Sequence, residues 1–144
     1  MTTEDFMAND GFSCEVIKSA RKLSVTEEIQ AEDVSTCERL DSLVGTDGTA
    51  LMIEVTNFVS LKIHNPKSRR NTDYETYLLC TETGAYCTGS RTLAESVWNV
   101  FDKLGKRGVN LDKVAVTLSI RKYPTSNYPG NYFMKASLVA YVEG

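Results

Sequence analysis

Apolar and polar residues alternate most regularly between Leu51 and His64. Apolar residues occupy every second position there but one, which is the period of a β-strand with one buried face. These positions are Leu51, Ile53, Val55, Val59, Leu61 and Ile63. Asn57 is the exception, so we expect one long strand with a bulge or bend at this residue.

Four shorter strands are expected after it. Residues 74–81 and 85–88 flank a Thr83-Gly84 turn, which predicts a β-hairpin. Residues 114–121 and 132–142 alternate again, and the loop between them contains two prolines and a glycine.

One helix interrupts the strands. Thr92 and Glu95 have the spacing of a capping box, and Gly105 is a typical helix end. Apolar residues recur between these signals with the helical period: Leu93, Val97, Val100, Phe101 and Leu104. We therefore expect a helix that begins near Thr92 and buries one face.

The resulting order, β-β-β-α-β-β, is that of the oligonucleotide/oligosaccharide-binding (OB) fold. This fold is a mainly β, five-stranded Greek-key barrel, with its helix here between strands three and four. An α+β sandwich with one helix on an open sheet, or another small barrel, would also fit this order.

Residues 1–50 have no sustained period. The run 16–25 fits a short strand or an extended arm, and residues 26–40 fit a helical turn or two. We interpret 1–50 as an N-terminal extension, with a possible role in oligomerisation, and 51–144 as the nucleic-acid-binding domain.

The charge of the chain changes sign along its length. The net charge is −3, but residues 1–60 carry about −8 and residues 61–144 about +5. Such a chain can bind an anionic polymer with its basic part and a basic neighbour with its acidic part. The 42% of hydrophobic residues is ordinary for a globular protein, and no apolar run is long enough to cross a bilayer. The first residues lack a signal-peptide pattern, so we expect a cytoplasmic protein.

The sequence contains few residues in the patterns that catalytic or metal sites require. The four cysteines and the single His64 lack zinc-site spacing, and the sequence has no phosphate-binding or metalloprotease motif. We expect no cofactor, no metal and no enzymatic activity.

Two loops carry the most informative side chains. In an OB fold, ligands lie across strands two and three and between the loops that join strands 1–2 and 4–5. Those loops are rich in cations, which neutralise phosphates, and in aromatic rings, which stack on unpaired bases. The expected phosphate contacts are Lys62, Lys67, Arg69, Arg70, Arg91, Arg121 and Lys122. The expected stacking residues are Phe58, Tyr74, Tyr77, Tyr123, Tyr128 and Tyr132, with a core position as the competing interpretation for about half of them.

Two stretches carry a family resemblance. TYLLCTETGAYCTGSRTLAESVWNVFD and VAVTLSIRKYPTSNYPGNYFMKASLVAYVEG resemble small single-stranded DNA-binding proteins of phages and conjugative plasmids of Gram-positive bacteria. The resemblance implies an OB-fold protein that coats single-stranded DNA without sequence preference during conjugation or replication. It also implies duplex DNA as a second ligand and self-association through an N-terminal arm. The alternatives are a protein-interaction module of a replication or conjugation complex and a small hydrolase or nuclease.

Overall fold

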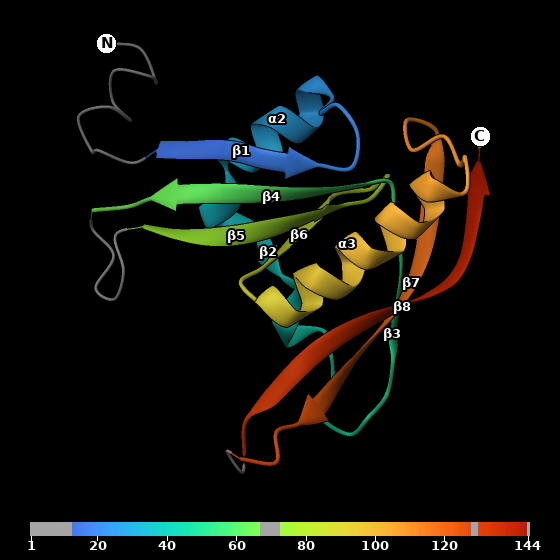
Figure 1. Ribbon diagram of the computed structural model, residues 1–144. Helices are drawn as coiled ribbons and strands as arrows, with labels where there is room; N and C mark the ends of the chain where they lie inside the picture. Colours follow the sequence, from blue (N-terminus) through green and yellow to red (C-terminus); the bar gives the residue numbers. More distant parts are fainter. Residues whose placement is uncertain (1–12, 67–72, 128–129, 144) are drawn as a thin grey trace.

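The computed structural model describes residues 13–66, 73–127 and 130–143. The chain is mainly β, with two sheets and two α-helices in the described part (Figure 1). The elements are β1 (Ser13–Ser19), α2 (Val25–Glu32), η1 (Val34–Thr36), β2 (Glu38–Arg39), η2 (Leu40–Ser42), β3 (Leu51–Val55), β4 (Asn57–His64), β5 (Asp73–Cys80), β6 (Ala85–Thr88), α3 (Arg91–Lys106), β7 (Val114–Pro124) and β8 (Tyr132–Glu143). None of the described helices has the length and apolar character needed to cross a membrane.

The long predicted strand bends between β3 and β4, as the interruption at Asn57 indicates. The Thr56 N–H donates to the Cys80 carbonyl at 2.8 Å. The fully buried Asn57 side chain accepts from Phe58 N–H at 2.9 Å and donates to the Arg21 carbonyl at 3.2 Å. The bend lets β3 pair with β7 while β4 pairs with β5.

The two sheets have the orders β1-β4-β5-β6-β2 and β3-β7-β8. All pairings are antiparallel except that of β2 with β6. Among the described residues β6 and β8 do not pair, so backbone hydrogen bonds do not close the strands into a barrel.

Helix α3 differs from its prediction at its ends only. It begins one residue earlier than expected, because Ser90 is the N-cap and its hydroxyl accepts from Leu93 N–H at 3.2 Å. Glu95 pairs with the Arg91 guanidinium at 3.6 Å rather than completing a capping box. The predicted apolar stripe, Leu93 to Leu104, is buried against both sheets.

Those residues of the N-terminal extension 1–50 that the structure describes pack against the predicted domain 51–144. β1 pairs with β4 along the edge of the larger sheet, and Leu40 and Val44 are buried in the same core as α3. This segment buries only isolated residues, so its apolar positions show no sustained helix or strand period that would predict its packing. Residues 1–12 lie outside the described residues.

A second, smaller core lies on the other face of the larger sheet. Ala31 and Val34, from α2 and η1, pack there against the apolar face of β4, β5 and β6. That face consists of Val59, Leu61, Ile63, Leu78, Cys80 and Cys87. The β4–β5 hairpin is therefore buried on both faces near the bend.

Candidate nucleic-acid interface

The outer face of the β7–β8 hairpin brings cations and rings together in register. Arg121 lies directly opposite Lys135, and Tyr123 lies directly opposite Phe133. Because alternate residues of a strand share a face, all four side chains lie on one side of the sheet. The opposite side carries Ile120, Met134 and Ala136, which are buried against α3.

The two rings form a platform. Tyr123 and Phe133 stack with their centroids 5.6 Å apart and their planes 26° apart. Tyr123 is 40% exposed, and the Lys135 ammonium lies 5.7 Å from the centre of the Phe133 ring. The next residues along the same face, Ser119 and Ser137, are small, so the rings stand open on this side. A surface of this kind offers a ring to a base and two cations to the adjoining phosphates.

Two other predicted residues lie on the opposite face of this hairpin. Lys122 is half-buried, and its ammonium donates to the Asp41 carbonyl at 2.7 Å. This bond holds Lys122 against η2, so it is a poor phosphate contact. Tyr132 is exposed near the tip of the hairpin, opposite Pro124.

The predicted residues on β4, β5 and α3 are less favourable for an anionic ligand. Lys62 lies between Glu15 of β1 and Glu75 of β5 in the cross-strand register. The guanidinium of Arg91 faces Glu95. Tyr74 is exposed, but it points to the opposite face of the sheet from Lys62. The structure therefore does not bring these three residues into one basic surface.

Two of the predicted stacking residues are core residues instead. Phe58 is fully buried and meets Trp98 edge to face at 4.9 Å. Tyr77 is 5% exposed, and its hydroxyl donates to Glu75 at 3.2 Å. Burial, with Glu75 as a second cause, raises the pKa of Tyr77. The physical reason is that α3 covers this face of β4 and β5, so neither ring is open to a base.

The outer face of β4, β5 and β6 is also unavailable. An OB fold would present a ligand on its second and third strands, but here α2 and η1 cover that apolar face. The expected ligand path across these strands is therefore covered where α2 and η1 pack on them. Lys67, Arg69, Arg70 and Tyr128, which complete the predicted set, lie outside the described residues.

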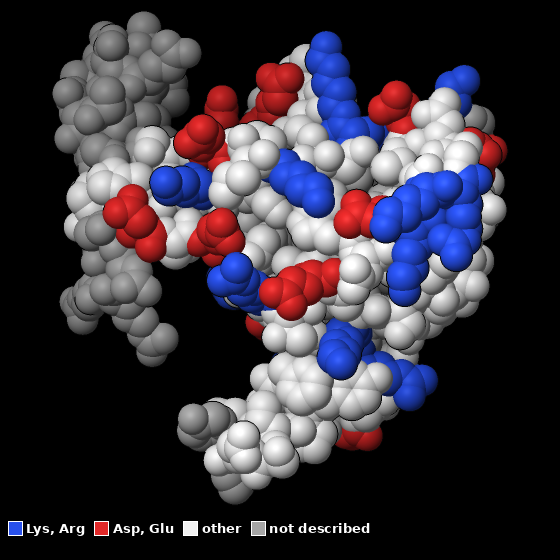
Figure 2. All heavy atoms as spheres, in the orientation of Figure 1, with Lys and Arg blue, Asp and Glu red and all other residues white. Residues whose placement is uncertain are grey.

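The charged side chains are unevenly distributed. In Figure 2, basic side chains lie on the lower lobe, where Figure 1 places the β7–β8 hairpin, and a larger basic group lies on the right over the end of α3. Lys103 and Lys106 belong to the last turn of α3, and Arg107 donates to the Lys103 carbonyl at 3.1 Å. Cations at this position stabilise the helix dipole, which accounts for the second group without a ligand.

Sequence reasoning missed Phe133 and Lys135 as site residues. The signal was present, because both belong to the alternate positions of residues 132–142 that face away from the core. What was lacking was the hairpin register, which pairs them with Tyr123 and Arg121.

Burial raises the thiol pKa of three of the four cysteines. All four are free and lie around the smaller core. Burial, with Cys87 as the second cause, raises the pKa of Cys37 to about 11, and burial raises that of Cys80 to about 12. Thiols that stay protonated are weak nucleophiles and weak metal ligands. No group of three or more potential metal ligands occurs among the described residues.

Comparisons of the chain with protein-family models, with curated proteins and with solved structures find no match.

Proposed function

We propose that this protein binds single-stranded DNA without sequence preference and coats it, with the outer face of the β7–β8 hairpin as its contact surface. The observation that carries the proposal is the register of Arg121 with Lys135 beside that of Tyr123 with Phe133. Ring stacking tolerates every base, and phosphate contacts carry no sequence information. Such a surface favours single strands over the base edges of a duplex groove.

The connectivity supports an OB-type architecture for this surface. One bent strand, β3–β4, pairs with β7 before the bend and with β5 after it, and α3 lies between β6 and β7 in the chain. We infer an OB barrel that is open between β6 and β8, in keeping with the partly open barrels of this fold. The β7–β8 hairpin then corresponds to the last two strands of the barrel.

The biological role rests on the family resemblance. A protein that coats single strands in plasmid conjugation or phage replication needs many equivalent weak contacts and no catalytic group. The open ring platform and the two adjacent cations suit that role. Duplex DNA would meet the same cations without the stacking, so we expect weaker binding to it.

The test is fluorescence anisotropy with a labelled single strand of ~60 nucleotides, its duplex and its RNA equivalent, at ~50 and ~200 mM salt. We expect salt-sensitive binding that favours the single strand. Replacing both rings, Tyr123→Ala with Phe133→Ala, should weaken it about 5- to 150-fold, which corresponds to the loss of one stacked base.

Tyr141→Ala is the matched control, because Tyr141 is an equally exposed tyrosine of the same strand β8, far from the hairpin tip. It should bind as the wild type does. Equal binding by the ring variants and the wild type would contradict the proposal, as would the absence of binding to all three nucleic acids.

A protein-interaction module is the second candidate function. It is favoured by one specific observation, a groove beside the unpaired edge of β3. The two functions use different surfaces and are compatible.

A further inference from the structure

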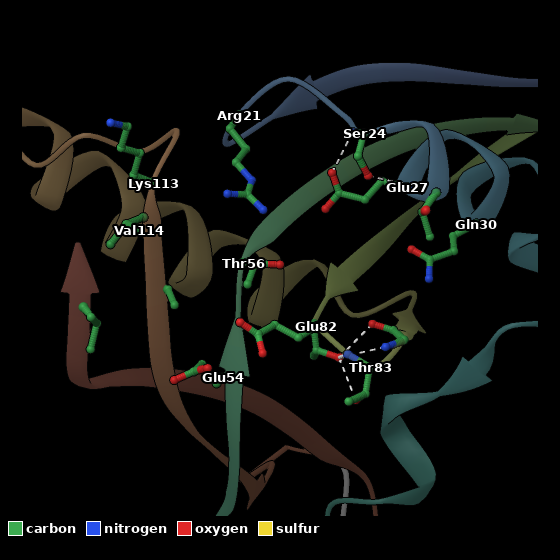
Figure 3. Close-up of a pocket in the computed structure, with 15 residues that line it drawn as sticks. Arg21, Ser24, Glu27, Gln30, Glu54, Thr56, Glu82, Thr83, Lys113 and Val114 are labelled. Atoms are coloured by element: carbon green, nitrogen blue, oxygen red, sulfur yellow. Dashed lines mark hydrogen bonds between the residues drawn. The ribbon is translucent and has the colours of Figure 1, made fainter. Parts of the chain in front are cut away.

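A groove follows the edge of β3 that does not pair with β7 and continues past the end of β3 to the first residues of β7. Two adjoining cavities of about 650 and 320 Å³ share Glu54, Thr81, Glu82 and Thr83 in their walls. In the smaller cavity one wall is β3, and the other is the turn between β5 and β6 together with Leu43 and Tyr86. The larger cavity adds the start of α2 and the first residues of β7. Figure 3 shows the larger cavity, with Glu54 and Glu82 below the bend at Thr56.

The strand that lines this groove has a free edge. β3 is the terminal strand of its sheet and pairs with β7 alone among the described elements. The unpaired N–H and C=O groups of such an edge can pair with another extended chain. A recessed edge is also protected from indiscriminate pairing, because only a chain that fits the groove can reach it.

The two sides of the groove differ in polarity, so they favour a ligand strand whose side chains alternate between apolar and cationic. On the inner side, Leu51, Ile53 and Leu43 offer apolar contacts. On the outer side, the exposed Met52 is followed by Glu54, with Glu82 across the groove. Since neighbouring residues of a strand point to opposite sides, a bound strand would place every second residue against the apolar side.

Two of the three carboxylates in the groove lack internal partners, whereas Glu27 accepts from Ser24 N–H and from Asn57 Nδ2. Neither Glu54 nor Glu82 makes a hydrogen bond or ion pair with any described residue. The Arg21 guanidinium donates to the Asp112 carbonyl at 3.1 Å, and in Figure 3 Lys113 points away from both carboxylates. A cationic side chain of a ligand would therefore meet two carboxylates that make no ion pair with a described residue, in a groove whose larger cavity Arg21 and Lys113 also line.

We propose that this groove binds an extended basic peptide of a partner protein, which adds a strand to the free edge of β3. Its apolar residues face Leu43 and Ile53, and its Lys or Arg residues face Glu54 and Glu82. The backbone of β3 supplies the affinity, and the alternation supplies the specificity. This site is separate from the β7–β8 ring platform and does not depend on nucleic-acid binding.

The test is anisotropy of a labelled nine-residue peptide in which Lys and Val alternate, added to the full chain without nucleic acid. We expect saturable binding. The double variant Glu54→Gln with Glu82→Gln should weaken it about 3- to 10-fold, as two exposed ion pairs would. A peptide with proline at its central position should bind about 2- to 10-fold more weakly, because proline removes a strand hydrogen bond.

Glu28→Gln with Glu32→Gln is the matched control, since both are exposed carboxylates of α2 outside the groove walls. It should leave peptide binding unchanged. Equal weakening by both double variants would show non-specific attraction and overturn the proposal. Equal binding of the proline peptide and the alternating Lys-Val peptide would also overturn the proposal. So would a dimer of the free protein that dissociates only when Glu54 and Glu82 are substituted, because a second copy of the chain would then occupy the groove.

Discussion

At the residue scale, Asn57 shows how one polar side chain fixes the bend. Its Oδ1 accepts from the backbone of Arg21 and Phe58, and its Nδ2 donates to the Arg21 carbonyl and to Glu27 Oε1 at 3.3 Å. Glu27 is itself buried and also accepts from Ser24 N–H. Asn57 therefore joins the N-terminal segment to the strand at the point where the strand turns.

Replacing Asn57 should be costly, because buried polar groups would lose their partners. We expect Asn57→Ala to lower the free energy of unfolding by about 2–4 kcal/mol. Asn57→Asp should lower it further at neutral pH, since it places a second carboxylate against Glu27. Urea unfolding measures both, with the exposed Asn131→Ala as control. A change of less than about 0.5 kcal/mol for Asn57→Ala would contradict this role.

At the element scale, α2 and η1 act as a cover for the larger sheet. A capping box of Ser24 and Glu27 begins α2, and Ala31 and Val34 supply the apolar contacts. The other side of α2 leaves Val25 and Ile29 exposed. A few buried residues, chiefly Ala31 and Val34, therefore hold α2 and η1 on the sheet, and their burial determines how stably this segment packs.

Two valines of this segment provide a matched pair. Val34→Asp places an unpaired charge in the smaller core and should lower the free energy of unfolding by about 3–4 kcal/mol. Val25→Asp changes an exposed residue of α2 and should alter it by less than about 0.5 kcal/mol. Thermal and urea unfolding distinguish them. Equal effects of the two substitutions would mean that the segment does not cover the sheet in solution.

At the scale of the whole molecule, two basic surfaces are candidates for the nucleic-acid contact that the proposed function requires. One is the hairpin face with Arg121 and Lys135, and the other is the end of α3 with Lys103 and Lys106. Only the first carries exposed rings beside its cations. The salt dependence of binding distinguishes the two surfaces, because only the surface that contacts the phosphates displaces counterions from the nucleic acid.

We expect Lys135→Ala to make the slope of log affinity against log salt less steep by about 0.7 on a single strand, the value for one phosphate contact. Lys106→Ala should leave this slope unchanged. Anisotropy titrations over a series of salt concentrations measure both slopes. The reverse result would move the interface to the end of α3.

Much of the fold from residue 51 onward could be predicted, because most of its strands and its helix bury one face and keep a regular period, although β4 and β5 are buried on both faces near the bend. The segment before it could not, since β1 pairs along one edge only and α2 buries only Glu27 and Ala31. Within the candidate site, the exposure of Tyr123 could be predicted, because the β7–β8 hairpin has one open face. The burial of Phe58 and Tyr77 could not be predicted, because alternation cannot show that a hairpin is covered on both faces.

The parallel pairing of β2 with β6 sets an order on folding during synthesis. Arg39 of β2 pairs with Cys87 of β6, so residues 34–44 cannot adopt their native packing until β6, almost fifty residues later in the chain, has left the ribosome. At ordinary translation rates that wait lasts roughly 3–10 s. Throughout it Leu40 and Val44 have no core to join. Residues 23–38 contain five carboxylates and no Lys or Arg, so we expect charge repulsion to oppose the association of neighbouring nascent chains until β6 has been synthesised.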